Sequence, residues 1–134
     1  MQRKTARENA FILLFEDVFK NDETAEEIFA KATEIRGLEY DEYVRTVFFG
    51  ASANSAVIDE VIENNLVGWK KERVSPVSRA LLRLATYEMM FMEDIPAKVS
   101  INEAIELSKK YDDEKAYSFV NGVLNGISAE LSEK

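Results

Sequence analysis

Cysteine and histidine are both absent from this 134-residue sequence. Without cysteine there is no disulfide and no thiolate nucleophile, and without histidine there is no imidazole to act as acid or base. The two absences also exclude the common zinc sites, which are built mainly from these residues. Carboxylate pairs, lysine, and serine with lysine remain as catalytic options, but no recognisable motif of these types occurs. We therefore expect a protein that is not an enzyme and that has no catalytic residues, metal site or cofactor.

Long apolar runs are absent as well. The longest, at residues 10–15, is followed directly by Glu16 and Asp17, and it falls far short of the roughly 20 residues that a membrane-spanning helix needs. The N-terminus also lacks the apolar segment and the small-residue cleavage site of a signal peptide. We therefore expect a cytoplasmic protein without membrane contact, and the absence of disulfides fits that location.

Glycine and proline are scarce, with five and two copies. Apolar residues make up 46% of the chain, which is enough to bury a core, and they recur at helical spacing in almost every segment. No segment shows the sustained alternation of a β-strand. We predict an all-α fold, a compact bundle of six or seven helices in a single domain, 1–134, with two helical subdomains at roughly 1–65 and 66–134.

Capping residues mark the starts of three of the predicted helices. They are Thr24 with Glu27, Ser75 with Pro76, and Ser100 with Glu103. Gly37 is a natural helix-ending residue, and Gly50, inside the third helix, is small enough for a close helix crossing. The predicted helices cover 3–19, 24–37, 41–65, 77–91, 100–111 and 114–131, with a short helix allowed in 66–75.

Charge is unevenly distributed along the chain. The formal net charge is -8, so the protein as a whole repels an anionic nucleic acid at long range. Arg3, Lys4 and Arg7, which we call the N-terminal tip, are three basic residues in a stretch without acids, whereas the rest of the chain has 14 basic against 25 acidic residues. The tip is therefore the main electrostatic indication of an anion-binding site.

Aromatic residues continue from the tip at helical spacing. Steps of four from Arg7 give Phe11, Phe15 and Phe19. Exposed aromatics beside arginines suit single-stranded RNA, because bases stack on rings while cations meet phosphates. The residues alone favour the alternative, in which the phenylalanines are core and the tip is merely solvated.

Three further features have two interpretations each. The basic cluster Lys70, Lys71 and Arg73 either extends a basic surface or, as we favour, keeps a loop soluble. Tyr111 and Phe119 either flank one surface patch or seal a corner between helices. Gly122, inside the last predicted helix, costs about 1 kcal/mol relative to alanine, and we favour close helix packing over backbone approach by a partner as its reason.

Four segments carry a resemblance to a known family. They are ARENA at 6–10, SRALLRLATYE at 78–88, DIPAKVSINEA at 94–104 and FVNGVL at 119–124. Together they resemble the motifs of the NusB family, and the likeness runs from residue 3 to about residue 127. The family is all-helical with two subdomains, and its members are binding proteins, in keeping with the missing catalytic residues.

The resemblance implies a function in transcription. NusB proteins pair with NusE, a small-subunit ribosomal protein, and together they bind single-stranded boxA RNA. The transcription elongation complex then reads through terminators in ribosomal RNA operons. Two alternatives stay open: a self-associating scaffold, in which a homodimer hides the RNA surface, and an RNA-binding protein that acts with a ribosomal RNA methyltransferase.

The resemblance also implies which residues bind. The RNA-binding set is Arg3, Lys4, Arg7, Phe15, Tyr111, Lys115 and Phe119. The NusE-facing set is Ser78, Arg79 and Leu82. The sequence departs from the family pattern at Thr5, Phe15, Ser78 and Asn125, where arginine, tyrosine, an acidic residue and aspartate are common. These departures affect RNA or partner contacts rather than the fold.

Overall fold

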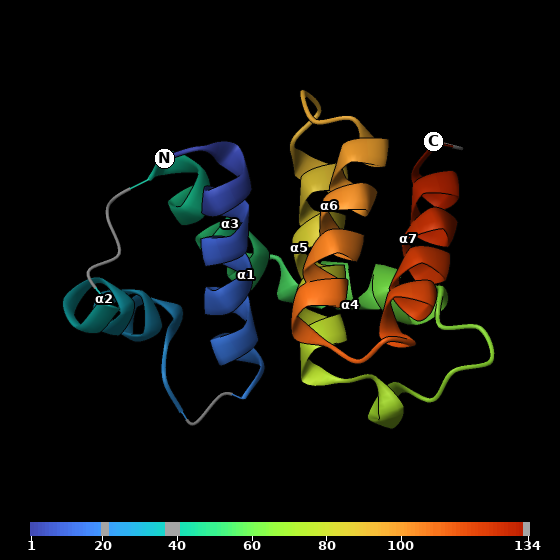
Figure 1. Cartoon of the computed structure of the whole chain (residues 1–134), viewed down its shortest axis with the longest axis horizontal. Coiled ribbons are helices and arrows are strands. Elements are labelled where there is room, and N and C mark those ends of the chain that lie inside the picture. Colours follow the sequence, from blue (N-terminus) through green and yellow to red (C-terminus); the bar gives the residue numbers. More distant parts are fainter. Residues whose placement is uncertain (20–21, 37–40, 133–134) are drawn as a thin grey trace.

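The computed structural model describes residues 1–19, 22–36 and 41–132. Within these ranges the chain forms seven α-helices, one 3-10 turn and no strand, which confirms the all-α prediction (Figure 1). The elements are α1 (Arg3–Val18), α2 (Ala25–Arg36), α3 (Glu42–Ala53), α4 (Ser55–Asn64), η1 (Lys71–Arg73), α5 (Pro76–Phe91), α6 (Ala97–Tyr111) and α7 (Ala116–Ser132). No helix in the described part of the chain is long and apolar enough to cross a membrane.

Helix α5 lies at the centre of the bundle. It packs against α1, α3, α4, α6 and α7, and Figure 1 shows α5 and α6 between α1 on one side and α7 on the other. Its apolar residues Leu81, Leu82 and Leu84 are at most 1% exposed. Because α5 contacts helices from both halves of the chain, it joins them through one core. The division into subdomains near residue 65 stays a prediction.

The close helix crossing predicted at Gly50 is confirmed. Gly50 of α3 faces Tyr87 of α5, and a Cβ added at Gly50 would lie 2.6 Å from the ring atoms Cε1 and Cζ of Tyr87. That separation is far inside van der Waals contact, so a side chain at this position would force the Tyr87 ring to shift.

The predicted continuous helix over 41–65 is wrong. The chain forms two helices there, α3 and α4, which meet at Asn54. The side-chain Nδ2 of Asn54 donates a hydrogen bond to the carbonyl oxygen of Gly50 at 2.8 Å, and such side-chain bonds compete with the helix ladder. The break lets both helices pack against α5. The helix end predicted at Gly37 lies outside the described residues.

Two of the three predicted caps are confirmed. The backbone N–H of Thr24 donates to the Glu27 carboxylate, and the N–H of Glu27 donates to the Thr24 hydroxyl oxygen, both at 3.1 Å. Ser75 accepts a hydrogen bond from the backbone N–H of Ser78 at 3.0 Å, and Pro76 is the first residue of α5. These starts follow from local sequence alone, because each donor and its acceptor are three residues apart.

The capping box predicted at Ser100 and Glu103 is wrong. Helix α6 already begins at Ala97, directly after Pro96, so Ser100 lies within the helix. Ser100 is 1% exposed, and its hydroxyl donates to the carboxylate of Glu88 on α5 at 2.7 Å. A tertiary contact therefore accounts for this serine.

Candidate nucleic-acid interface

Arg7, expected on phosphate, lies in the interior. Its side chain is only 5% exposed, and its Nε donates a hydrogen bond to Oε2 of Glu88 at 2.9 Å. Glu88 also accepts hydrogen bonds from the hydroxyls of Tyr43 and Ser100. Burial by itself would lower the pKa of Arg7, but the hydrogen bond and charge of Glu88 raise it above its ordinary value. The network joins α1, α3, α5 and α6, so the predicted phosphate contact of Arg7 does not fit the structure.

The other two cations of the N-terminal tip are exposed but already contact other groups. The Arg3 guanidinium lies 4.6 Å from the centre of the Tyr43 ring, and Nζ of Lys4 lies 3.8 Å from a carboxylate oxygen of Glu103. A hollow of about 230 Å³ beside them is lined by Lys4, Arg7, Glu8, Glu103, Glu106, Leu107 and Lys110. Three cations and three carboxylates face this hollow, so it offers phosphate no net positive charge.

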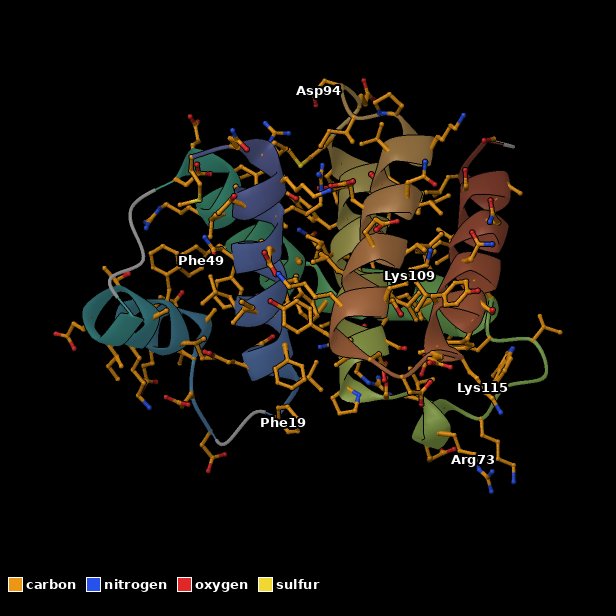
Figure 2. All side chains as sticks on the ribbon, viewed as in Figure 1. Phe19, Phe49, Arg73, Asp94, Lys109 and Lys115 are labelled. Carbon is orange, nitrogen blue, oxygen red and sulfur yellow. The ribbon has the colours of Figure 1, made fainter. Side chains whose placement is uncertain are left out.

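The phenylalanines of α1 form a row of rings that continues onto α6. Ring centres are 5.1 Å apart for Tyr111 and Phe11, 6.2 Å for Phe11 and Phe15, and 5.1 Å for Phe15 and Phe19. Phe11 is buried and Phe15 half-buried, whereas Phe19 is 52% and Tyr111 40% exposed. Core packing therefore accounts for Phe11, and the row reaches the surface at Phe19 (Figure 2) and at Tyr111.

Glu8 of α1 accepts a hydrogen bond from the hydroxyl of Tyr111. The Glu8 carboxylate accepts hydrogen bonds from Nζ of Lys110 at 2.6 Å and from the Tyr111 hydroxyl at 2.5 Å. These two bonds lower the pKa of Glu8, and Glu8 in turn raises the pKa of Tyr111 and of Lys110. The hydroxyl of Tyr111 is therefore already hydrogen-bonded, and its ring is the part that remains free to stack on a base.

Lys115 and Phe119 lie against the connector between α4 and α5. Helix α1 begins and helix α7 ends at one end of the molecule, whereas α7 begins at the other (Figure 1). The rings of Phe119 and Trp69 meet at 64° with their centres 4.7 Å apart. They border a hollow of about 320 Å³, which we name the connector pocket and which is lined by Trp69, Lys70, Arg73, Val74, Ser75, Ser78, Asp112, Asp113, Lys115, Ala116 and Phe119. The short helix allowed in the connector is present as η1.

The cations of the connector pocket differ from those of the tip. Lys70, Arg73 and Lys115 form no ion pair with any described residue, whereas the neighbouring Lys71 pairs with Glu63. Figure 2 shows Arg73 and Lys115 together at this end of the molecule. Trp69 lies outside the residues predicted to bind, and its signal in the sequence is an aromatic residue inside a basic connector.

The three residues expected to face NusE separate in the structure. Ser78 and Leu82 are 2% and 0% exposed, since residues one turn apart on α5 share its inward face. The Ser78 hydroxyl lies 3.4 Å from Oδ2 of Asp112, and Leu82 belongs to the core. A direct partner contact by either does not fit the structure. Arg79 is half-buried, and its Nη2 donates to the carbonyl oxygen of Lys71 at 3.2 Å.

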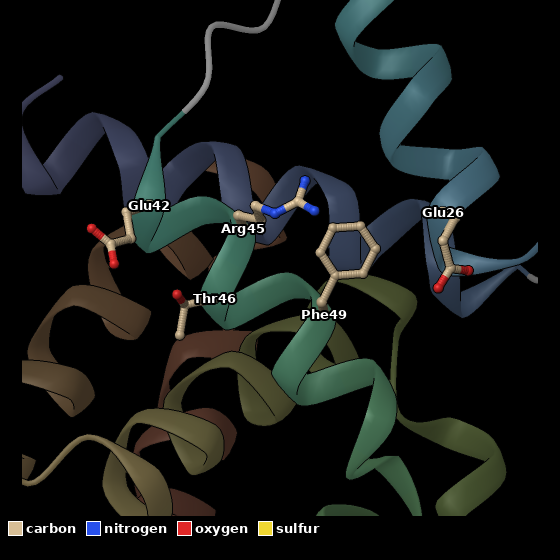
Figure 3. Close-up of a pocket in the computed structure, with 5 residues that line it drawn as sticks. All are labelled: Glu26, Glu42, Arg45, Thr46 and Phe49. Atoms are coloured by element: carbon tan, nitrogen blue, oxygen red, sulfur yellow. The ribbon is translucent and has the colours of Figure 1, made fainter.

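An open depression of about 550 Å³ lies between α2 and α3 (Figure 3). It is lined by Glu26, Glu42, Arg45, Thr46 and Phe49. The Arg45 guanidinium lies 5.3 Å from the ring centre of Phe49 and 5.7 Å from that of Phe29. Since cation–π contacts occupy the Arg45 guanidinium and two carboxylates line the same hollow, we assign this depression to the packing of α2 on α3.

Gly122 is exposed on α7, and a Cβ added there would meet no atom within 4 Å. The favoured explanation, close helix packing, is therefore wrong at this position. Packing does explain Gly126 on the same helix, where a Cβ would lie 2.7 Å from Oδ1 of Asn65. The open backbone at Gly122 leaves approach by a partner as the remaining interpretation.

Comparison with known proteins gives matches over nearly the full length. The profile of the NusB family matches residues 4–129. The transcription antitermination protein NusB of Bacillus licheniformis is 44% identical over 131 residues, covering 98% of this chain and 99% of that protein. The protein of the same name from Bacillus pumilus is 42% identical and covers 100% of both chains.

Solved structures agree with the sequence comparison. NusB of T. maritima has a TM-score of 0.85 at 38% identity, covering 97% of this chain and 92% of that one. A chain in a crystal structure of antitermination factors NusB and NusE in complex with dsRNA has a TM-score of 0.83 at 32% identity, covering 96% of both chains. The helical bundle and the sequence thus agree over almost every residue, and the chain belongs to the NusB family.

Proposed function

We propose that this chain is a transcription antitermination factor that binds boxA-type RNA together with a NusE-type ribosomal protein. The observation that carries the proposal is its likeness, over 96% of its length, to a chain in the NusB–NusE–RNA complex. Relatives named for transcription antitermination support the same role. In this proposal the chain acts by binding alone, without catalysis, on the transcription elongation complex in the cytoplasm.

The RNA surface that we propose runs along α1 and the end of α6 to the start of α7. Arg3 and Lys4 supply cations at one end, and the ring row with Phe15 and Tyr111 lies between. Lys115 and Phe119 complete the surface at the other end. Helix α1 alone has 16 residues, which is about 24 Å of length, so the RNA is expected to lie extended across several nucleotides.

For NusE we propose a surface on α4, the start of α5 and the part of the connector at Lys71. Arg79 is the residue of the predicted set that reaches this surface, beside Asp59, Glu63 and Lys71. Ser78 and Leu82 act from beneath by holding α5 in place. Arg79→Ala is therefore expected to weaken NusE binding, whereas Leu82→Ala is expected to act through stability.

RNA binding measured with and without NusE tests the proposed function. A labelled boxA-type single strand and a matched duplex would be titrated with the full chain, at salt concentrations between about 50 and 200 mM. We expect weak binding by the chain alone, tighter binding with NusE, and an affinity that falls steeply with salt. A NusE that binds the chain but gives no enhancement for either RNA would contradict the proposal.

A further inference from the structure

We infer that the connector pocket is a nucleotide site, which takes one base against Trp69 and the adjoining phosphate at Lys70, Arg73 and Lys115. This inference rests on the proposed function, because it names a further part of the RNA surface. The residues from 69 to 73 lie outside the set that the family resemblance implies. Sequence reasoning favoured a solubilising role for this basic cluster.

The aromatic part of the pocket is fixed in position yet open to solvent. Trp69 is 57% exposed, and Phe119 lies against it at a ring-centre distance of 4.7 Å. The core does not require this tryptophan, since its ring lies outside the buried cluster. An indole held by a second ring, with much of its surface free, is the platform on which a nucleobase stacks.

The connector that carries Trp69 is an ordered turn. Gly68 has a φ of +79°, and the N–H of Trp69 donates to the carbonyl oxygen of Leu66 at 3.0 Å. A β-turn whose third residue has a positive φ favours glycine at that position. Gly68 therefore sets the direction in which the chain presents Trp69. The next turn follows at once, closed by the hydrogen bond from the N–H of Arg73 to the carbonyl of Lys70 at 2.9 Å. Ring and cations are thus placed by adjacent short-range hydrogen bonds.

The charge of the pocket suits a phosphate. Its three cations have no ion-pair partner among the described residues, whereas both of its carboxylates are engaged. Oδ2 of Asp112 accepts from the Ser75 hydroxyl at 2.6 Å, and Oδ1 of Asp113 accepts from the backbone N–H groups of Lys115 and Ala116 at 2.9 and 3.1 Å. The lining has an excess of one positive charge on a chain of net charge -8, so an anion is drawn here rather than to the balanced hollow beside the tip.

The size and the surroundings of the pocket favour one nucleotide of a longer strand. Its volume of about 320 Å³ lies at the low end of the range of roughly 300–1,000 Å³ for small-ligand sites. Phe119 and Lys115, which belong to the proposed RNA surface, line the same hollow. Gly122, three residues after Phe119 on α7, leaves its backbone open to a strand that continues from the pocket.

Trp69 is the only tryptophan of the chain, so its fluorescence reports directly on this pocket. In titrations of the full chain with a boxA-type single strand, with and without NusE, we expect the emission to be quenched in step with binding. Trp69→Ala is expected to weaken RNA binding by roughly 5- to 150-fold, the range that corresponds to losing one stacked base. Trp69→Phe should lose less, and the pair Lys70→Ala and Arg73→Ala should lower the salt dependence of binding. Lys98→Ala, at an exposed lysine near the start of α6, is the matched control.

The outcomes separate this inference from the proposed function. If the wild-type chain binds RNA but its fluorescence does not change, and the Trp69 and Lys70/Arg73 variants bind as tightly as wild type, the pocket is not a nucleotide site and the proposed function stands. If the wild-type chain binds no RNA even with NusE, the proposed function fails. If NusE alone quenches Trp69 and Trp69→Ala loses NusE rather than RNA, the pocket is a protein contact and the inference is overturned. Circular dichroism of each variant shows whether a loss reflects unfolding, and the charge variants keep the test decisive if Trp69→Ala unfolds.

Discussion

The N-terminal tip and the connector pocket each contain three basic residues, yet the fold surrounds them differently. At the tip, Arg7 pairs with Glu88 and Glu103, which follow it by 81 and 96 positions, and Lys4 also reaches Glu103. In the pocket, the cations have no ion-pair partner among the described residues. A basic cluster is therefore available to phosphate only where the fold brings no acid into an ion pair with it.

This comparison reverses the expectation from sequence. The tip is the most basic stretch of the chain, but one of its three cations is built into the core and a second is paired at the surface. The basic residues of the connector have an acid, Glu72, between them, yet Lys70 and Arg73 form no ion pair with any described residue. Whether a basic residue is free to bind phosphate thus depends more on the acids that the fold brings near it than on the local composition of the sequence. The structural role of Arg7 and the proposed binding role of the pocket can be separated by experiment.

The largest effect is expected at Arg7. Arg7→Ala leaves Glu88 buried without its cation, and removing one partner of a buried pair costs about 3–5 kcal/mol. We expect the free energy of unfolding, measured by urea denaturation, to fall by that amount. Arg73→Ala, the matched arginine of the connector pocket, should change it by less than about 0.5 kcal/mol.

The opposite result at Arg7 would break the comparison. If Arg7→Ala unfolds at the same urea concentration as wild type but binds RNA much more weakly, its guanidinium faces RNA in solution. The tip and the pocket would then both be RNA-binding surfaces.

A smaller effect is expected at Gly122, beside the pocket. Gly122→Ala should raise the free energy of unfolding by up to about 1 kcal/mol, because alanine is the better helix former and its methyl group meets nothing. If RNA approaches this backbone, the same substitution should weaken RNA binding while the fold gains stability. Gly126→Ala is the control on the same helix, since its Cβ would lie against Asn65 and should give no such gain. If the Gly122→Ala chain is stabilised but its RNA affinity is unchanged, RNA does not approach the backbone at Gly122, and the RNA surface ends at the connector pocket.

The smallest effect is expected at Glu8, where the tip can be made more like the pocket. Glu8→Gln removes the carboxylate that holds Lys110 and Tyr111. Lys110 is then free to meet phosphate, and we expect RNA binding to tighten by less than about fivefold, as for loss of one exposed ion pair. Weaker binding would show that Glu8 places Tyr111 for the RNA.

The same variant has a pH signature. In the wild type, the pKa of Tyr111 is raised by the hydrogen bond to Glu8, so this contact stabilises the fold below the pKa of an unfolded tyrosine and is lost as pH rises through the folded-state value. The pKa of Tyr111, followed by an NMR pH titration, should fall back toward its ordinary value in Glu8→Gln. An unchanged pKa would mean that the contact is absent in solution.

Local rules predicted much of the fold from the sequence. Helical spacing gave the all-α class, and the caps at Thr24 and Ser75 were found because their partners lie within one turn. The break at Asn54 and the true start of α6 were missed. Docking of both α3 and α4 onto α5, and the bond from Ser100 to Glu88, depend on residues that sequence spacing does not bring together.

The candidate site was harder to predict for the same reason. Spacing placed Arg7 and Phe15 on one helix, but it gave no indication that Glu88 would neutralise Arg7. Phe119 was singled out, yet its partner Trp69 lies 50 positions earlier in a connector without helical periodicity. A site assembled from a loop and a distant helix becomes visible only once the tertiary contacts are known.

One measurement tests the central claim most directly, namely RNA affinity as a function of salt for two double variants. One variant carries Arg73→Ala and Lys115→Ala in the connector pocket, and the other carries Arg3→Ala and Lys4→Ala at the tip. Each lost phosphate contact should reduce the slope of log affinity against log salt by roughly 0.7 for a single strand. We predict the larger loss of affinity and the larger change in slope for the pocket variant. A larger loss for the tip variant, with the pocket variant close to wild type, would contradict the account.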